Sequence, residues 1–197
     1  MAGTVFLDRD GVIIEQLWYV KRNEFGPPHC PEDIKFFPFV FESLGRLMHA
    51  KYDLFLVSNQ PDCAKGRATI DALKNVHKKL DEILKANNIN FKEYFYCYHH
   101  PKGIVPEYSH VCECRKPKPF FLQKAAEQYG IDLKNAWMVG DQDTDVECGR
   151  AVGSRTILLD TPSSARNRGK SLPSYKAKDL SEAVNIIICS EQENSGG

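Results

Sequence analysis

The sequence has no surplus of charge of either sign and no long apolar run. Its 26 lysine and arginine residues are balanced by 26 aspartate and glutamate residues, so the formal net charge is zero. A general nucleic-acid-binding protein is expected to carry a surplus of basic residues, so the zero net charge excludes this class. No segment approaches the roughly 20 consecutive apolar residues that a membrane-spanning helix needs. We expect neither nucleic acid nor a membrane among the partners of the protein.

The beginning of the sequence lacks the features of a secretory signal. Residues 1–9 contain no basic region followed by a long apolar stretch. The seven cysteines are an odd number, which in a chain without a signal indicates a reducing compartment. In such a compartment, clustered cysteines bind metal or react more often than they form disulfides. The sequence therefore predicts a cytoplasmic protein.

Length and composition are those of one ordinary globular domain. The chain has 197 residues, of which 42% are hydrophobic and 26% charged, and a chain of this size usually forms one core. It contains no internal repeat. We expect a single domain over residues 1–190, followed by a polar, disordered tail at 191–197. We also expect a monomer.

Apolar runs alternate with segments of helical periodicity along the chain. Because alternating strands and helices form doubly wound sheets, the sequence predicts an α/β fold with a mostly parallel sheet. A flap at about 12–37 and a loop at about 97–118 interrupt this alternation, and loops of such length are usually functional. Strands are predicted at 4–8, 53–57, 94–98, 136–139 and 156–159, and helices from about 40, at 68–87, 119–130, 144–151 and 180–188, the last of which could also be a strand.

Acidic residues stand where two of the predicted strands end. Asp8 and Asp10 follow the first strand, and Asp141 and Asp145 follow the strand at 136–139. Ligands of doubly wound sheets bind beyond the carboxyl ends of the strands, so these groups converge on one edge. One carboxylate of the first pair could attack phosphorus while the other transfers a proton, and the second pair suits Mg²⁺. Taken singly, an Asp-Gly turn and a helix start explain the same residues.

Basic and polar residues are expected at the same edge. Arg115, Lys116 and Lys118 stand just before the helix at 119–130, and cations beside a helix N-terminus make a cradle for an anion. A solvated charged face is the alternative. Ser58 and Asn59 follow the strand at 53–57, although on their own they are ordinary loop residues.

Three cysteines and a histidine gather in the loop at 97–118. Cys97, His99, Cys112 and Cys114 offer three thiolates and an imidazole, which suit a tetrahedral Zn²⁺ site. The loop has few apolar residues, so a metal would supply the missing constraint. Buried free thiols or a disulfide between neighbouring cysteines are the alternatives. His100 could replace His99 as the ligand, and His110 is a further candidate. Core or incidental positions are expected for the other four cysteines, which are Cys30, Cys63, Cys148 and Cys189.

Together these motifs resemble the haloacid dehalogenase (HAD) superfamily of phosphatases. The resemblance runs from about residue 4 to 160 and implies that Asp8 is the nucleophile and Asp10 the general acid and base. It implies that Ser58 and Lys116 hold the transferring phosphoryl group. It also implies that Mg²⁺ is bound by Asp8, the backbone carbonyl of Asp10 and Asp141. The order that carries the resemblance is Asp8-x-Asp10-Gly11, then Ser58, then a lysine before a helix, then Gly140-Asp141-x-x-x-Asp145.

Within that superfamily, the chain is similar to a small, zinc-containing branch. This branch includes D-glycero-D-manno-heptose-1,7-bisphosphate 7-phosphatases and histidinol-phosphatases. It uses the first histidine of the pair, which favours His99, and it favours Lys116 over Lys118 as the catalytic lysine. The long interval between His99 and Cys112 is similar to that of the heptose enzymes. The marks are Asp-Arg-Asp-Gly at 8–11, Ser-Asn-Gln at 58–60, Cys-x-His-His-Pro at 97–101 and Cys-x-Cys-Arg-Lys-Pro at 112–117.

This resemblance implies a magnesium-dependent phosphatase that acts through a phosphoaspartate, with a HAD-like sheet, a minimal cap and a structural zinc. The implied substrate is a small phosphorylated metabolite, a heptose bisphosphate, contacted by Asn59 and Arg115. Three departures affect the substrate: an extra stretch in the flap around residues 24–33, Phe120 in place of a common glycine, and Gln142 in place of a frequent lysine. A histidinol-phosphatase or another small sugar phosphatase is therefore an alternative. From another class, a phosphate-accepting signalling module or a protein-binding zinc loop is the alternative.

Overall fold

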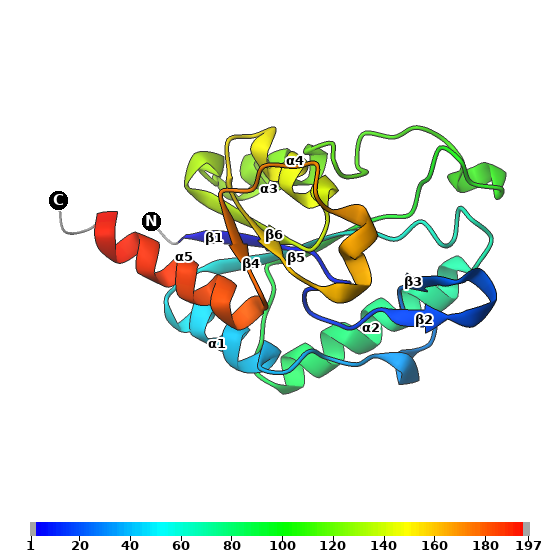
Figure 1. Cartoon of the computed structure of the whole chain (residues 1–197), viewed down its shortest axis with the longest axis horizontal. Coiled ribbons are helices and arrows are strands. Elements are labelled where there is room, and N and C mark those ends of the chain that lie inside the picture. The colour runs from blue at the N-terminus through cyan, green and yellow to red at the C-terminus, as the bar shows by residue number, and fades with distance from the viewer. Residues whose placement is uncertain (1–2, 195–197) are drawn as a thin grey trace.

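The computed structural model describes residues 3–194, and a six-stranded sheet forms its centre (Figure 1). Every neighbouring pair of strands is parallel. This confirms the predicted α/β fold. The strand order across the sheet is β5 (Glu93–Cys97), β4 (Asp53–Asn59), β1 (Thr4–Leu7), β6 (Ala136–Gly140), β7 (Arg155–Leu159) and β8 (Tyr175–Ala177).

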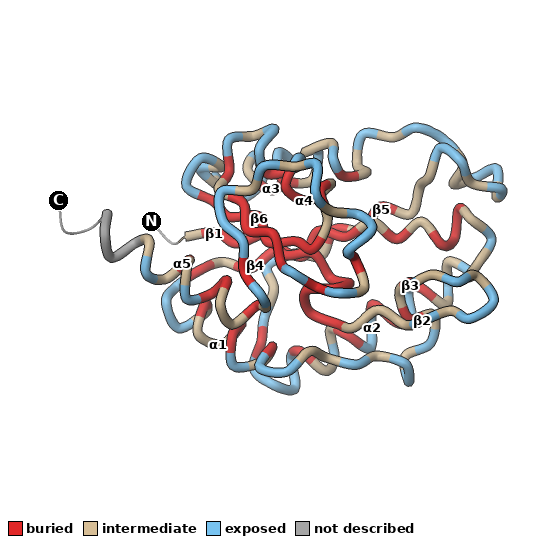
Figure 2. The backbone as a smooth tube through the Cα atoms, in the orientation of Figure 1, coloured by how far each residue is buried: buried red, intermediate tan, exposed pale blue. Residues whose placement is uncertain are grey.

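Helices cover both faces of the sheet. On one face α1 (Val40–His49), α2 (Ile70–Ala86) and α5 (Leu180–Asn194) pack against the side chains of Val5 and Leu7 and their neighbours. On the other face α3 (Phe120–Tyr129) and α4 (Asp143–Arg150) pack around Phe6. Because β1 is buried on both faces, its sequence is a continuous apolar run rather than an alternating one. Figure 2 shows the buried residues concentrated along the central strands and in the loops that leave them.

The flap contains a short hairpin that the sequence analysis did not predict. Strands β2 (Leu17–Tyr19) and β3 (Glu24–Gly26) pair antiparallel, and Trp18 stands opposite Phe25. Asn23 ends the connecting turn with a φ of 50°, a left-handed conformation that asparagine tolerates better than most residues. Strands of three residues are too short for an alternation to be recognised. The remaining short helices are η1 (Val20–Arg22), η2 (Pro31–Asp33), η3 (Pro106–Tyr108), η4 (Leu133–Asn135) and η5 (Pro162–Asn167).

The C-terminal part of the chain differs from the predictions in two places. The edge strand β8 was not predicted, because it is short and two of its three residues are exposed. The segment at 180–188 is helical, and α5 continues to Asn194 because glutamate and glutamine favour helix. The predicted disordered tail therefore begins inside a helix, and its last residues, 195–197, lie outside the described residues. Within the described part of the chain, no helix has the length and apolarity needed to span a membrane.

Candidate active site

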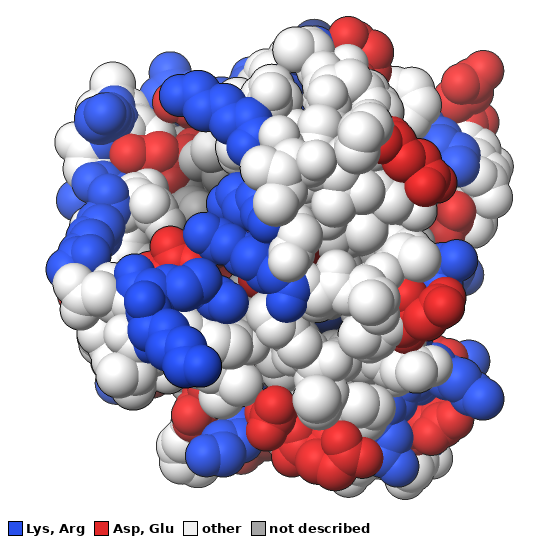
Figure 3. All heavy atoms as spheres, turned by 90° about the vertical axis from the view of Figure 1, so that its right-hand side faces the viewer, with Lys and Arg blue, Asp and Glu red and all other residues white. Residues whose placement is uncertain are grey.

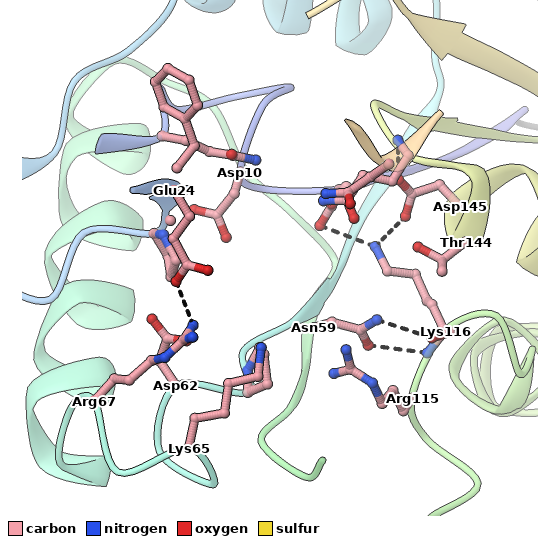
Figure 4. A pocket seen from close by; sticks show the side chains of 18 residues that line it. Asp10, Glu24, Asn59, Asp62, Lys65, Arg67, Arg115, Lys116, Thr144 and Asp145 are labelled. Atoms are coloured by element: carbon pink, nitrogen blue, oxygen red, sulfur yellow. Dashed lines mark hydrogen bonds and ion pairs between the residues drawn. The ribbon is translucent and has the colours of Figure 1, made fainter. Parts of the chain in front are cut away.

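A cleft of about 330 Å³ opens at the carboxyl ends of β1 and β4. The loop after β1, the flap, the loop after β4, the end of the cysteine-rich loop and the start of α4 all contribute to its walls (Figure 4). The residues singled out from the sequence that line it are Asp8, Asp10, Asn59, Arg115, Lys116, Gln142 and Asp145. Segments far apart in the sequence therefore meet at the predicted edge of the sheet.

The amine of Lys116 lies between two carboxylates at the bottom of the cleft. Its Nζ is 3.0 Å from Asp8 Oδ1 and 2.7 Å from Asp145 Oδ1, and it donates a 2.6 Å hydrogen bond to the carbonyl of Val57. Burial opposes the charge on this amine, but the carboxylates of Asp145 and Asp8 outweigh burial and raise its pKa. Lys116 is therefore a fixed, buried cation beside Asp8.

The backbone of Lys116 is held by the side chain of Asn59. The Asn59 amide donates from Nδ2 to the carbonyl of Lys116 and accepts from its backbone N–H, both at 3.1 Å. Two bonds to one residue fix its position more strictly than one bond does. Asn59 thus joins the end of β4 to the end of the cysteine-rich loop. Its predicted contact with substrate stays a prediction.

Three carboxylates form a compact acidic cluster beside Lys116. One oxygen each from Asp8, Asp141 and Asp145 lies within 4.8 Å of the others. Burial, followed by the charges of Asp8 and Asp145, raises the pKa of Asp141 well above its usual value, and Oδ1 of Asp141 makes no hydrogen bond within residues 3–194. A divalent cation would remove this repulsion, and oxygen ligands of this kind suit Mg²⁺.

Gly11 leaves the space in which Asp141 lies. Its φ is +84°, a conformation that L side chains rarely adopt, and a Cβ at this position would collide with Oδ2 of Asp141. A second contact fixes this turn, because the Thr161 hydroxyl donates a 2.7 Å hydrogen bond to the carbonyl of Gly11. The glycine of the first motif is therefore required by the acidic cluster.

Asp10 lies beside this cluster rather than within it. Its carboxylate accepts hydrogen bonds from the side chains of Arg9 and Gln60, both of which are fully buried. Burial raises the pKa of Asp10, and the charge of Arg9 opposes that effect. Ser58 is also buried, does not line the cleft, and accepts a 3.0 Å bond from Gln60. The sequence analysis quoted Arg9 and Gln60 within its motifs but assigned them no role.

Three cations stand around the mouth of the cleft. Lys65 and Arg115 extend toward each other from different loops (Figure 4), and within the described residues neither forms an ion pair with a carboxylate. The third cation, Arg67, is paired with Glu24 at 2.8 Å and with Asp62 at 3.3 Å. Figure 3 shows lysine and arginine side chains gathered on this face around a hollow in which acidic side chains are visible. Lys65 and Arg115 are thus available to an anion; Lys65 was missed because it lies in no cluster of charges.

The flap is fastened to the loop after β4 by ion pairs around Asp62. Nε2 of His29 lies 2.8 Å from Oδ2 of Asp62, and Arg67 joins Asp62 to Glu24 of β3. His29 is half-buried at the base of the flap. Burial raises the pKa of Asp62, but the hydrogen bond and charge of His29 and the charge of Arg67 outweigh burial and lower it below its usual 3.8.

Replacing this aspartate should therefore destabilise the protein in a pH-dependent way. A carboxyl with a lowered pKa stabilises the fold above its unfolded pKa, and this contribution disappears as pH falls through the folded pKa. We expect Asp62→Asn to lower the free energy of unfolding by about 2 kcal/mol near neutral pH, and this difference to disappear only as pH falls below the usual 3.8 and through the lowered pKa of the folded protein. Denaturant unfolding of both proteins from pH 7 down to about pH 2 measures this difference. Asp160, an exposed residue that pairs with Arg168, supplies the control Asp160→Asn, for which little change is expected at any pH. Equal losses in both variants would contradict the prediction.

The three cysteines and the histidine of the loop at 97–118 come together in space. The sulfur atoms of Cys97, Cys112 and Cys114 are 3.2 to 3.6 Å apart, and His99 Nδ1 is 3.4 Å from Cys114 and 3.8 Å from Cys97. Ligands around a tetrahedral zinc are about 3.8 Å apart, whereas a disulfide needs about 2.05 Å. The donor set therefore fits zinc, and all seven cysteines are free.

Other features of this loop agree with a metal site. The hydrogen bond with Cys97 lowers the pKa of the Cys114 thiol to about 5, which favours the thiolate that a metal binds. The second histidine, His100, is not part of this cluster, and its Nδ1 accepts a hydrogen bond from the backbone of Lys102. Arg115 is joined to the loop because its Nη1 donates a 3.4 Å bond to the carbonyl of His99.

The chain is similar to several bacterial phosphatases. The D-glycero-beta-D-manno-heptose-1,7-bisphosphate 7-phosphatase of Vibrio cholerae is 34% identical over 93% of this chain and 95% of that protein. The D-glycero-alpha-D-manno-heptose-1,7-bisphosphate 7-phosphatase of Photorhabdus laumondii is 32% identical over 79% and 81%. A family model described as HAD-hydrolase-like matches residues 113–183. The crystal structure of D,D-heptose 1,7-bisphosphate phosphatase from B. bronchiseptica, complexed with magnesium and phosphate, has the same fold, with a TM-score of 0.80 and 23% identity over 95% of this chain and 99% of that one.

Proposed function

Because the chain belongs to the HAD-like phosphatases, in the family of D-glycero-D-manno-heptose-1,7-bisphosphate 7-phosphatases, we propose that it removes the 7-phosphate of such a heptose bisphosphate. The observation that carries this proposal is the arrangement of the cleft. A buried lysine stands beside a carboxylate at the bottom, and two cations that form no ion pair within residues 3–194 stand at the mouth. One end of the cleft suits the reacting phosphate and the other a second phosphate of the same molecule.

In the first step, Asp8 attacks the phosphorus atom in line and forms a phosphoaspartate. The amine of Lys116 lies 3.0 Å from the attacking carboxylate, where it would neutralise charge on the oxygens of the phosphoryl group as they move. Ser58, at the end of β4, is the proposed second holder of these oxygens. Most of the benefit in phosphoryl transfer comes from such positioning and electrostatic stabilisation.

Asp10 is the proposed general acid and base. It lines the cleft two residues beyond Asp8, and burial raises its pKa, which suits a carboxyl that must carry a proton near neutral pH. It would protonate the oxygen of the departing sugar in the first step. In the second step it would accept a proton from the water that cleaves the phosphoaspartate.

Phosphatases of this superfamily use Mg²⁺, and the acidic cluster of this chain fits that ion. Asp8 and Asp141 would hold it, together with the backbone carbonyl of Asp10. Asp145, the third member of the cluster, is paired with Lys116 and keeps the lysine in place. When bound, the ion supplies positive charge that offsets the repulsion between the phosphate and Asp8.

Zinc is the proposed structural ion of the loop at 97–118. Cys97, His99, Cys112 and Cys114 would hold it, and its effect would be to fix the segment that ends in Arg115 and Lys116. One ordered loop would then deliver both the lysine at the reacting phosphate and an arginine at the mouth.

The second phosphate is assigned to Lys65 and Arg115. We expect Lys65→Met to raise KM for the heptose 1,7-bisphosphate about tenfold and to change KM for a heptose 7-phosphate less than about twofold, because a charge-assisted bond contributes about 1.5–3 kcal/mol. Steady-state phosphate release measures both. Lys118→Met is the matched control, since this lysine pairs with the exposed Glu113 and does not line the cleft. A uniform change for both substrates would contradict the assignment.

A phosphate-release screen with Mg²⁺ tests the proposed function itself. We expect the largest kcat/KM among both anomers of D-glycero-D-manno-heptose 1,7-bisphosphate, with loss of the 7-phosphate alone. A larger kcat/KM for histidinol phosphate would select the alternative enzyme. Phosphate release that does not depend on Asp10 would favour a phosphate-accepting signalling module. The cytoplasmic location and the monomeric state stay predictions from the sequence.

A further inference from the structure

Arg9 is the feature of this site that the proposed mechanism leaves unused. Its side chain is completely buried, and only Trp137 is larger among the fully buried side chains of the described residues. Burying a guanidinium costs several kcal/mol unless its charge is paired and its hydrogen bonds are made. An arginine at such a position therefore has a specific partner.

That partner is Asp10, and the contact is made at both of its oxygens. Nε and Nη2 of Arg9 donate to Oδ1 at 3.1 and 2.9 Å, and Nη2 also donates to Oδ2 at 3.0 Å. Asp10 is the one ion-pair partner of Arg9 within the described part of the chain. The pair is formed by two neighbouring residues of the loop after β1.

Gln60 closes the arrangement from the loop after β4. Its Oε1 accepts a 2.7 Å bond from Nη2 of Arg9, and its Nε2 donates to Oδ2 of Asp10. The Gln60 backbone is anchored in turn, because its N–H donates a 2.7 Å bond to the carbonyl of Cys97 at the end of β5. Arg9, Asp10 and Gln60 thus form a closed ring of three side chains that is fixed to two strands.

Two groups that sense the charge of Arg9, His77 and Tyr96, do not compete for it. The ring of His77 stacks on Tyr96 with centroids 3.6 Å apart, and the Tyr98 hydroxyl is 2.9 Å from Nδ1 of His77. Burial, and then the charge of Arg9, lowers the pKa of His77 to about 2, so this imidazole stays neutral. Burial raises the pKa of Tyr96, which keeps its hydroxyl neutral as well. Within residues 3–194, Nε and Nη2 of Arg9 therefore bond to Asp10 and Gln60, and its Nη1 makes no hydrogen bond.

We propose that Arg9 and Gln60 are positioning residues that hold the carboxyl of Asp10 toward the leaving group and away from the acidic cluster of Asp8, Asp141 and Asp145. This inference rests on the acid and base role proposed for Asp10. Without the ring, the carboxylate of Asp10 would be free to rotate toward the acidic cluster, where it could bind the same cation. The reaction would then lose its proton donor although the nucleophile and Lys116 were intact.

Leaving groups of different basicity test this proposal. The alkoxide of a sugar needs a proton as it departs, whereas 4-nitrophenolate does not. A misplaced general acid therefore slows formation of the phosphoaspartate only with the sugar phosphate. We expect Arg9→Met to lower kcat/KM for the heptose bisphosphate roughly 100-fold and for 4-nitrophenyl phosphate less than about threefold, with Gln60→Met roughly tenfold on the first substrate. Arg9→Lys should recover little, because an ammonium cannot reproduce two parallel bonds to one carboxylate. The kcat for both substrates should fall, since hydrolysis of the phosphoaspartate needs Asp10 as base.

Two reference variants separate the possible outcomes. Asp10→Asn must show the same dependence on the leaving group; if it does not, the acid role in the proposed function fails. If Asp10→Asn shows it but Arg9→Met and Gln60→Met lower kcat/KM by the same factor for both substrates, or for neither, the positioning proposal alone is overturned. Arg155→Met removes an arginine that lies over Trp137 at the opposite end of the sheet, and we expect it to leave the ratio of the two kcat/KM values unchanged. If Arg9→Met does not fold, Gln60→Met decides the question by the same ratio.

Discussion

Asp8→Asn should abolish turnover and leave the fold intact. The amide is a poor nucleophile toward phosphorus, so the phosphoaspartate cannot form, and we expect kcat to fall on the order of 10⁴-fold or more. Stability should be kept or increased, because Asp8 stands within 4.8 Å of Asp141 and Asp145 in a cluster with one buried lysine. Removing one of three like charges relieves repulsion.

Two measurements check this result. Phosphate release from the heptose bisphosphate gives the loss of activity, and thermal unfolding gives the stability. Asp160→Asn is a matched control, since it makes the same chemical change at an exposed residue outside the cleft, and its kcat should equal that of the wild type. Turnover retained in Asp8→Asn would overturn the mechanism, and loss of folding in Asp8→Asn with activity kept in Asp8→Ala would do so equally.

Cys112→Ser should destabilise the loop at 97–118 and reduce activity at the same time. The change removes one of four ligands from a site that holds a segment with little apolar packing. We expect a loss of bound zinc and a fall in the free energy of unfolding of about 3 kcal/mol. Activity should fall as well, because Arg115 is bonded to the carbonyl of His99 and Lys116 follows it directly.

The control for this prediction is another cysteine of the same chain. Cys189 is exposed and has no cysteine neighbour, so Cys189→Ser should keep zinc, stability and activity. Elemental analysis of protein purified without chelator measures zinc, and denaturant unfolding measures stability. Wild-type protein without zinc, or a Cys112→Ser protein as stable as the Cys189→Ser protein, would rule out the structural role of the ion.

The sheet could be predicted from the sequence because burial leaves a simple pattern. Thr4–Leu7 and Asp53–Asn59 are covered by helices on both faces and are therefore almost continuously apolar. The convergence of Asp8, Lys116 and Asp141 followed from one rule, that ligands of such sheets bind beyond the carboxyl ends of the strands. The cysteine cluster could be predicted because its ligand types are rare and closely spaced.

The remaining features depend on contacts that no local pattern encodes. The ring of Arg9, Asp10 and Gln60 joins residues about 50 positions apart, and an arginine within a charged motif is expected at the surface rather than in the core. The pairing of Asp145 with Lys116 was hidden because a helix start explains an acidic residue equally well. The hairpin at 17–26 and the strand β8 are too short to give a recognisable period.

Three consecutive residues at the end of β4 carry three separate parts of this site. Ser58 is paired with Tyr96 and Asn59 with Cys97 in the register of the sheet, and the Gln60 N–H continues that ladder to the carbonyl of Cys97. The amide of Asn59 holds the backbone of Lys116, and the amide of Gln60 holds Asp10 and the hydroxyl of Ser58. Successive strand residues point to opposite sides. Inserting or deleting one residue in β4 would therefore place each of these side chains where its neighbour now stands, and the three contacts would be lost. The contacts of the site therefore constrain the length of β4. Among active enzymes of this family, we expect insertions and deletions to fall in the loops on either side of this strand.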